Sequence, residues 1–236
     1  MAGFQFKQFY VSHDRSSMKV GTDGVLLGRV AKSEHPERIL EVGTGCGVIA
    51  LELAQRYQAK IDAIDIDAPS VEEAAVNFSQ SPWNARLTAT LSSLQEFGAG
   101  REACYDMIVS NPPFFSNSLK AAEGRRSQAR HNDTLSYSDL LLYSRQLLES
   151  NGGLWVILPL EESRKLEELA KKYGFALHYE MLIHPKPGKD ANRRIMGLGN
   201  PVKGIIQYPE HLTIRQNNGN FTSQYQALMV DFYLHF

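Results

Sequence analysis

The sequence predicts an α/β protein in which helices cover both faces of a mostly parallel sheet. Short apolar runs alternate with amphipathic helical patterns along most of the chain. The first of these runs ends in a Gly-rich turn that opens directly into a helical pattern. The 236 residues are enough for one sizeable core, and they contain no internal repeat.

The strands and helices follow one another in a regular order. We expect strands at residues 38–43, 60–66, 86–91, 105–110, 153–159 and 175–185, and helices between them at 48–58, 68–80, 136–150 and 161–174. Pro69 stands near the start of its helix, where a missing N–H costs little. Asn151, Gly152 and Gly153 end the third helix, and Gly174 ends the fourth.

The two ends of the chain complete the predicted architecture. The spacer at 186–192 is too short for a helical crossover, so the apolar run at 193–199 should turn back beside the preceding strand. The tail at 221–236 fits a closing helix or strand. Near the N-terminus, Asp23 and Gly24 suit a turn that opens a helix at 25–31.

Composition narrows the class of protein. The net charge of −1 argues against binding nucleic acid over the whole surface, although it allows a local basic patch. No apolar run approaches the roughly 18 residues of a membrane span, and the N-terminus has no secretory h-region. Cys46 and Cys104 offer neither a disulfide framework nor metal-ligand spacing. We therefore expect a cytoplasmic protein without metal or membrane, and a monomer is favoured.

The Gly-rich turn "LEVGTGCG" indicates a site for a nucleotide-like ligand. Gly43, Gly45 and Gly47 permit positive φ and let a ligand approach backbone N–H groups at a helix start. The dinucleotide pattern G-x-G-x-x-G fails, because Val48 stands at its third glycine. Asp65 ends the second strand about 20 residues after the turn, a range from which an acid can reach ribose hydroxyls. Asp67 shares its face of the strand and competes for that role.

The glycine turn has one acid before it, Glu41, and a second acid, Asp65, at the end of the next strand. This pattern resembles the cofactor site of class I S-adenosylmethionine-dependent methyltransferases. The resemblance implies that the turn lies under the amino-acid end of the cofactor and that Asp65 accepts from its ribose. It also implies a contact with the adenine amino group after the third strand. Ser92 and Ser93 stand there in place of the common acid, and we assign the contact to Ser93, whose hydroxyl can accept a hydrogen bond.

The stretch "YDMIVSNPPFF" ends the fourth strand, because two adjacent prolines remove backbone donors. The Asn111 side-chain oxygen and the Pro112 carbonyl can accept both hydrogens of a planar exocyclic amine and direct its lone pair at a methyl donor. Phe114 can stack on the ring. The pattern resembles the amino-methyltransferases, which modify adenine N6, cytosine N4, guanine N2 or a glutamine amide. Positioning and electrostatics would carry the rate.

The block "FQFKQFYVSHDRSSMKVGTDGVLLG", taken with both motifs, closely resembles the bacterial methyltransferases that modify N6 of adenine 37 in a valine tRNA. The resemblance covers essentially the whole chain. It implies a Rossmann-like, mostly parallel seven-stranded sheet in a single domain over 1–236. The N-terminal segment, residues 1–30, has little periodicity, so we expect it to be an arm or cap on the core. If this segment caps the site, Lys19, Thr22 and Asp23 would lie over the carboxylate and amino ends of the cofactor, and Asn111 would contact the cofactor as well. The acceptor would be a tRNA anticodon-loop adenine.

Two basic clusters support an RNA acceptor. One contains Lys120, Arg125, Arg126 and Arg130 against Glu123, and the other contains Lys186, Lys189, Arg193 and Arg194 against Asp190. We expect phosphate contacts from them and a splayed base held by aromatic side chains such as Phe114, Phe115 and Tyr137. The alternative is that these charges only solvate loops. His131 and His184 receive no role.

Rival functions remain open at this stage. A glutamine N5-methyltransferase acting on protein would usually carry an N-terminal helical domain, for which there is no room before Glu41. A guanine-N2 rRNA methyltransferase commonly has a longer or duplicated chain. Val48 disfavours an NAD-dependent oxidoreductase, and a module that only binds cofactor or RNA would need degenerate motifs, whereas both look intact.

Overall fold

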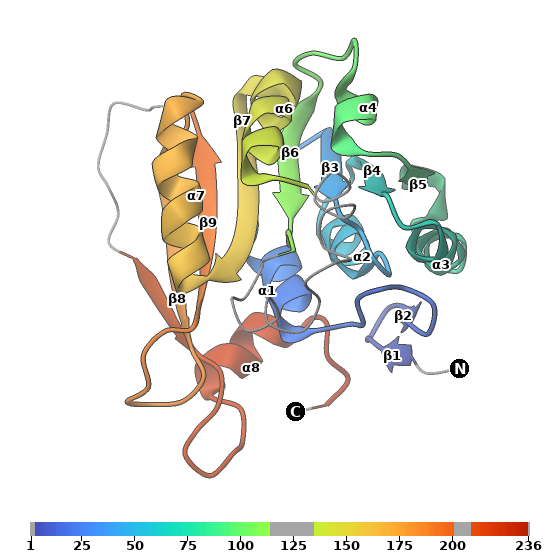
Figure 1. Ribbon diagram of the computed structural model, residues 1–236. Helices are drawn as coiled ribbons and strands as arrows, with labels where there is room; N and C mark the ends of the chain where they lie inside the picture. The colour runs from blue at the N-terminus through green and yellow to red at the C-terminus, as the bar shows by residue number, and fades with distance from the viewer. Residues whose placement is uncertain (1–2, 114–134, 201–208, 236) are drawn as a thin grey trace, which may run out of the picture.

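The computed structural model describes residues 3–113, 135–200 and 209–235 (Figure 1). Within these ranges, eight strands form one sheet in the order β10-β8-β9-β7-β6-β3-β4-β5. Their bounds are β3 Arg38–Val42, β4 Lys60–Asp65, β5 Leu87–Leu91, β6 Tyr105–Ser110, β7 Leu148–Pro159, β8 Ala176–His184, β9 Arg193–Gly199 and β10 Glu210–Thr213.

The sheet is mostly parallel, as the sequence predicts. Strands β5, β4, β3, β6 and β7 pair in parallel, β9 lies antiparallel between β7 and β8, and β10 pairs parallel with β8. The expected return of the chain after the sixth strand is confirmed, because Ile183 pairs with Arg193 across the short spacer. The described part of the sheet has eight strands, whereas seven were expected, and the additional strand is β10. It is only four residues long, too short to stand out as an apolar run.

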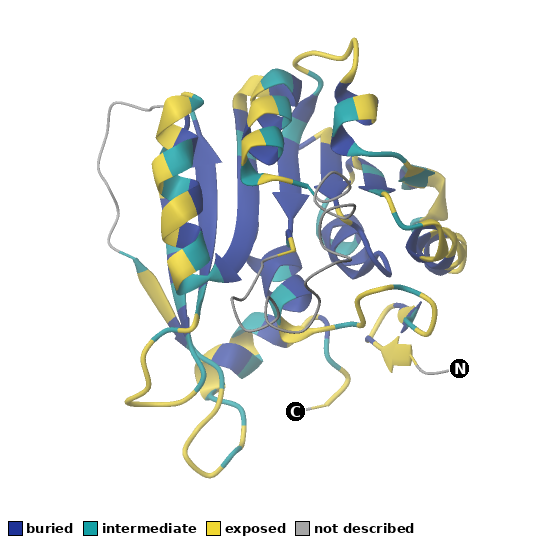
Figure 2. Ribbon diagram, viewed as in Figure 1, coloured by how far each residue is buried: buried dark blue, intermediate teal, exposed yellow. Residues whose placement is uncertain are grey.

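Helices cover both faces of the sheet (Figure 1). They are α1 Thr22–Val30, α2 Val48–Arg56, α3 Ala68–Ser79, α4 Leu94–Gly98, α6 Tyr137–Leu147, α7 Leu160–Lys172 and α8 Ser223–Met229, with a 3-10 turn η1 at Asn84–Arg86. Successive residues of a strand point to opposite faces of the sheet and therefore belong to two separate hydrophobic cores. Ile39 packs in the core with α1 and α2, and Leu40 packs in the core with α6 and α7. Figure 2 shows the central strands buried between helices whose outer faces are exposed, whereas the edge strands β5 and β10 are partly exposed.

The N-terminal segment begins with a hairpin of β1 Gly3–Gln5 and β2 Tyr10–Ser12. Phe6 and Phe9 are buried, and their rings stack with centroids 4.5 Å apart. Phe6 also pairs with Tyr233 in an isolated bridge, so the two ends of the chain lie together. The hairpin is therefore anchored by aromatic packing, although its sequence has little periodicity.

The structure changes one expected boundary and decides between two expected forms of the C-terminal tail. The helix expected to reach residue 150 ends at Leu147, because Leu148 already pairs with Tyr105 as the first residue of β7. The tail forms the short helix α8, whose cap is the Thr222 hydroxyl accepting from Tyr225 N. In the part of the chain that the structure describes, no helix is long and apolar enough to cross a membrane.

Candidate active site

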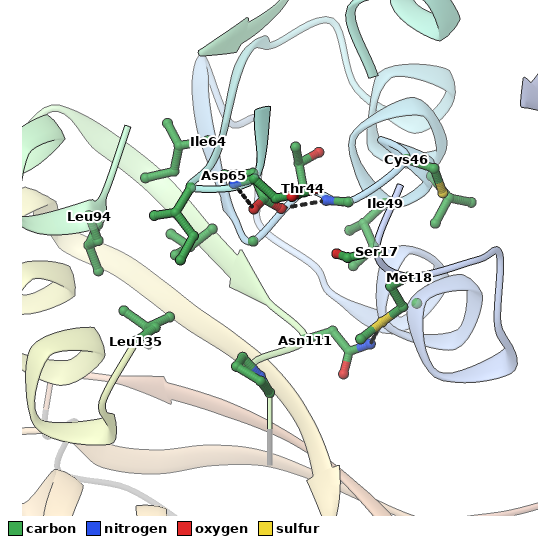
Figure 3. A pocket seen from close by; sticks show the side chains of 18 of the residues that line it. Ser17, Met18, Thr44, Cys46, Ile49, Ile64, Asp65, Leu94, Asn111 and Leu135 are labelled. Atoms are coloured by element: carbon green, nitrogen blue, oxygen red, sulfur yellow. Dashed lines mark hydrogen bonds between the residues drawn. The ribbon is translucent and has the colours of Figure 1, made fainter. Parts of the chain in front are cut away.

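The carboxyl ends of β3, β4, β5 and β6 open on one cavity of about 1410 Å³ (Figure 3). Its walls come from the turn after β3, the residues after β4 and β5, the Asn-Pro-Pro segment after β6, and the N-terminal residues 17–24. The carboxyl edge of an α/β sheet is where ligands of such folds bind. The cavity exceeds the range of about 300–1,000 Å³ that small-molecule sites occupy, so it has room for a cofactor and part of an acceptor.

The glycine turn lies at the floor of this cavity and is held by β4. Gly43 N and Thr44 N both donate to Ile64 O, at 2.9 and 3.0 Å, and Gly45 N donates to Asp65 Oδ2 at 2.9 Å. Gly43 and Gly45 have φ of 75° and 53° and line the cavity. A Cβ at Gly43 would have no neighbour within 4 Å, so a ligand can approach the backbone there.

Gly47 has a different use from the other two glycines. It lies at φ 82° as the N-cap of α2, and it does not line the cavity. A Cβ at this position would stand 2.5 Å from Cε1 of Phe78, on α3. The expected contact of Gly47 with a cofactor is corrected to a packing role, in which α2 and α3 approach closely.

The expected contact of Glu41 with a cofactor is also corrected. Its side chain is fully buried and does not line the cavity. The carboxylate oxygen Oε2 accepts from Thr44 Oγ1 at 2.7 Å and from Ala50 N at 3.1 Å. Burial raises the pKa of Glu41 to about 8, against the opposing effect of these two hydrogen bonds. Glu41 thus joins the glycine turn to the first turn of α2, and the structure does not bring its side chain to the cavity wall.

The two candidate ribose acids differ in their partners. Asp65 lines the cavity, and its carboxylate accepts from Gly45 N at 2.9 Å and from Asp67 N at 3.0 Å. Asp67 caps α3, because its Oδ2 accepts from Ser70 N at 3.1 Å and from Ser70 Oγ at 2.6 Å. The position of Asp65 is therefore fixed by the glycine turn itself, whereas one oxygen of Asp67 is committed to the helix.

The loop after β5 contains an acid that sequence reasoning missed. Ser93 caps α4, and its hydroxyl both accepts from Glu96 N and donates to Glu96 Oε2, at 3.2 and 2.9 Å. Glu96 lines the cavity together with Ser92 and Ser93. The S-x-x-E spacing of a capping box was the signal for it. The exposed side chains of Ile66 and Leu91 add apolar walls that suit a flat ring.

Asn111 faces the same cavity as the glycine turn. Ser110 pairs with Val42 in the β3–β6 register, so the residues that follow them lie at neighbouring strand ends. Nδ2 of Asn111 donates to the Met18 sulfur at 3.7 Å, which leaves the amide oxygen to accept other bonds (Figure 3). Pro113 lines the cavity, and Pro112 is buried. Phe114, Phe115, Lys120, Arg125, Arg126 and Arg130 lie outside the described residues.

The predicted N-terminal site residues do meet the cavity. Lys19, Thr22 and Asp23 all line it, at the start of α1. Asp23 Oδ2 accepts from Arg193 Nε at 2.7 Å, so Arg193 stands at the cavity edge in an ion pair with Asp23.

The second basic cluster divides into buried and exposed members. Arg194 is buried, and it pairs with Glu167 and Glu180 at 2.7 and 2.6 Å, so its expected contact with RNA is corrected to an ion pair inside the protein. Lys186 and Lys189 are exposed on the spacer after β8. Among the described residues, no group of three or more His, Cys, Asp or Glu side chains could hold a metal ion.

Comparison with known proteins agrees with this geometry. Residues 16–176 match the family model described as "Methyltransferase small domain". The chain belongs to this family. A protein of Parabacteroides distasonis named "tRNA1(Val) (adenine(37)-N6)-methyltransferase" is 43% identical over 232 residues, covering 98% of this chain and 97% of the relative. A Photorhabdus laumondii protein of the same name is 38% identical over 237 residues, covering 99% and 96%.

A solved structure supports the fold alone. A predicted O-methyltransferase from Agrobacterium tumefaciens superposes with a TM-score of 0.69 at 20% sequence identity, covering 89% of this chain and 96% of that one. The class I methyltransferase fold expected from the sequence is confirmed.

Proposed function

We propose that this member of the methyltransferase family transfers a methyl group from S-adenosylmethionine to the exocyclic N6 of an adenine in tRNA, and that this adenine is residue 37 of a valine tRNA. The observation that carries the proposal is that Asn111 and the glycine turn open on one cavity. The names of relatives identical at 43% and 38% over nearly the whole chain support the tRNA acceptor.

The residues around the cavity fit the donor from end to end. Gly43 and Gly45 leave space under its amino-acid end, and Lys19 supplies a cation for the carboxylate. Asp65 keeps acceptor capacity for ribose hydroxyls beyond its two backbone bonds, which favours it over Asp67.

At the far end of the cavity, Ile66 and Leu91 would flank the adenine of the donor. Ser93 is occupied in its cap with Glu96, so we assign the adenine amino group to the Glu96 carboxylate, with the serine as its support. This assignment restores an acid where the sequence has two serines.

The chemistry requires little proton transfer before the methyl group moves. When bound, S-adenosylmethionine supplies a sulfonium methyl that is already activated. Asn111 Oδ1 would accept from an N–H group of the target amine, which holds the nitrogen and favours a tetrahedral lone pair. A second acceptor bond from the Pro112 carbonyl stays a prediction, because Pro112 is buried and only its neighbours Asn111 and Pro113 line the cavity. Ser110 Oγ donates to Val42 O at 2.8 Å and fixes the end of β6 beside β3. Stacking of the base on Phe114 stays a prediction.

Exposed cations at the same edge of the sheet support a polyanionic acceptor. Lys186 and Lys189 stand on the spacer after β8, and Arg215 follows β10, which runs parallel to β8. The guanidinium of Arg215 lies 4.3 Å from the centroid of the Phe221 ring. Phosphate contacts from these side chains would give salt-dependent affinity. Because tRNA is the proposed acceptor, we predict that the enzyme acts in the cytoplasm.

One experiment tests the acceptor directly. The protein is incubated with labelled S-adenosylmethionine and total tRNA from cells that lack the enzyme, and the nucleosides are analysed after digestion. Label in N6-methyladenosine is expected. Label in N2-methylguanosine, or on protein, would instead support the guanine or glutamine alternatives. An Asn111→Ala preparation run in parallel shows the background.

A further inference from the structure

A strap of eight residues, Ser12–Lys19, runs from β2 toward α1 along the edge of the donor cavity. Its last three residues, Ser17, Met18 and Lys19, line that cavity. We propose that Glu73 and Asn77, both on α3, are positioning residues for methyl transfer that act by clamping this strap over the donor. The proposal rests on the proposed function of the cavity and adds residues that do not touch it.

Glu73 binds the first half of the strap with its whole carboxylate. Oε1 accepts from Asp14 N at 2.8 Å, Arg15 N at 3.1 Å and Ser12 Oγ at 3.1 Å, and Oε2 accepts from Ser16 N at 2.8 Å. Three consecutive backbone N–H groups thus converge on one buried carboxylate, in the manner of an anion-binding concavity. Burial alone would raise the pKa of Glu73, but these bonds outweigh it and lower that pKa.

Asn77 joins the strap to the glycine turn. Its Oδ1 accepts from Ser12 N at 2.9 Å, while Nδ2 donates to Ser12 O and to Cys46 O, both at 2.8 Å. Cys46 lies inside the glycine turn, so one buried amide fixes the start of the strap relative to the turn. A displacement of either segment would break bonds to the same side chain.

The other end of the strap reaches both halves of the reaction site. The Met18 sulfur accepts from Asn111 Nδ2 at 3.7 Å, and Met18 O would stand 3.7 Å from a Cβ at Gly45 (Figure 3). Ser17 N donates to Ser70 Oγ at 3.2 Å. Met18 therefore spans the distance between the donor turn and the amide that grips the acceptor amine.

These contacts make a specific prediction about function. In Glu73→Gln one carboxylate oxygen becomes an NH2 group, so at least one of the backbone N–H groups faces a donor in place of its acceptor and the negative charge is lost. The strap then no longer places Met18 and Lys19 at the cavity. The two hydrophobic cores contain no residue of the strap, so they stay intact. Donor binding and turnover should fall without a proportionate loss of folded protein.

The test compares Glu73→Gln with Glu72→Gln. Both changes remove one negative charge from adjacent positions of α3, but Glu72 meets the strap only through an exposed ion pair with Arg15, which contributes little. We expect Glu73→Gln to weaken S-adenosylhomocysteine binding by about tenfold or more in calorimetry, and to lower kcat, and Glu72→Gln to stay within about twofold of wild type. Urea unfolding gives the folded fraction of each variant.

A second measurement needs no variant. Amide hydrogen exchange of the wild-type protein is followed at Asp14, Arg15 and Ser16 with and without S-adenosylhomocysteine. We expect the ligand to slow exchange there by about tenfold, because a clamped strap is part of the donor site. Unchanged exchange, or Glu73→Gln binding as well as Glu72→Gln, would overturn the proposal.

Failure of the clamp and failure of the proposed function are distinguishable. Donor binding is measured without tRNA, so a wild-type protein that binds S-adenosylhomocysteine but methylates no tRNA refutes the acceptor, and the strap inference is then decided by whether Glu73→Gln binds more weakly than Glu72→Gln. A wild-type protein that does not bind S-adenosylhomocysteine overturns both. If tRNA methylation is normal in Glu73→Gln, the acceptor stands and the positioning role is refuted.

Discussion

Substituting Gly47 by alanine should destabilise the protein mainly through packing at the α2–α3 contact. The residue lies at φ 82°, where a non-glycine residue costs about 1–2 kcal/mol. The new Cβ would also stand 2.5 Å from Phe78 Cε1 and 3.3 Å from Ala74 Cβ, and both neighbours are buried. Overpacking of this kind costs about 1–3 kcal/mol. The total is about 2–5 kcal/mol, which corresponds to a fall in Tm of roughly 4–20 °C for a chain of this length.

Urea unfolding followed by circular dichroism measures this loss, and Gly43→Ala is the matched control. Gly43 has a similar φ of 75°, but a Cβ there meets nothing within 4 Å and points into the cavity region. We expect Gly43→Ala to lose only about 1–2 kcal/mol of stability while its affinity for S-adenosylhomocysteine falls. Equal destabilisation by the two substitutions would refute the packing argument, and so would unchanged unfolding of Gly47→Ala.

Three further single substitutions and one double substitution probe the site. Asn111→Ala should reduce methyl transfer by about a hundredfold or more with donor affinity mostly kept, and near-normal turnover would exclude its role. Asp65→Ala should weaken donor binding by about tenfold or more, whereas unchanged calorimetry would move the ribose contact elsewhere. The pKa of Glu41 is about 8 in the folded protein and 4.5 in the unfolded chain. Between pH 4.5 and pH 8 the folded protein therefore keeps a proton that the unfolded chain has released, so the free energy of unfolding falls as pH rises through this range. Glu41→Gln should flatten that fall, which amounts to about 3–5 kcal/mol, and a pH profile identical to wild type would disprove the assignment. Reversing the charges of Lys186 and Lys189 should weaken tRNA binding and lower its salt slope, while reversing two exposed lysines of α7 should not.

Much of the site could be predicted because its motifs stand at the ends of predicted strands. The register Val42–Ser110 brings Gly43 beside Asn111, as the parallel order requires. The sequence could not separate the glycines that line the cavity from Gly47, where the close approach of Phe78 on the next helix requires a glycine. It also could not show that Glu41 points away from the cavity, because a buried strand has two buried faces.

Other differences have similar causes. Arg194 has the same charge as its exposed neighbours in sequence, but its position inside β9 buries it against Glu167 and Glu180. Asp65 and Asp67 differ because Asp67 caps α3, and the Asp-Ala-Pro-Ser sequence at residues 67–70 could have indicated this cap. The assignment of residues 1–30 as an arm or cap, in a single domain over the whole chain, stays a prediction.

The placement of β9 has a consequence for the order in which the chain can fold during synthesis. β8 leaves the ribosome before β9, yet among the described strands it joins the rest of the sheet only through β9, because β9 lies between it and β7 and β10 pairs on its outer edge. The edge of β7 therefore stays unpaired until residue 199 has been made. An unpaired edge attracts other strands, so a chain stalled or truncated before Arg193 should be prone to aggregation.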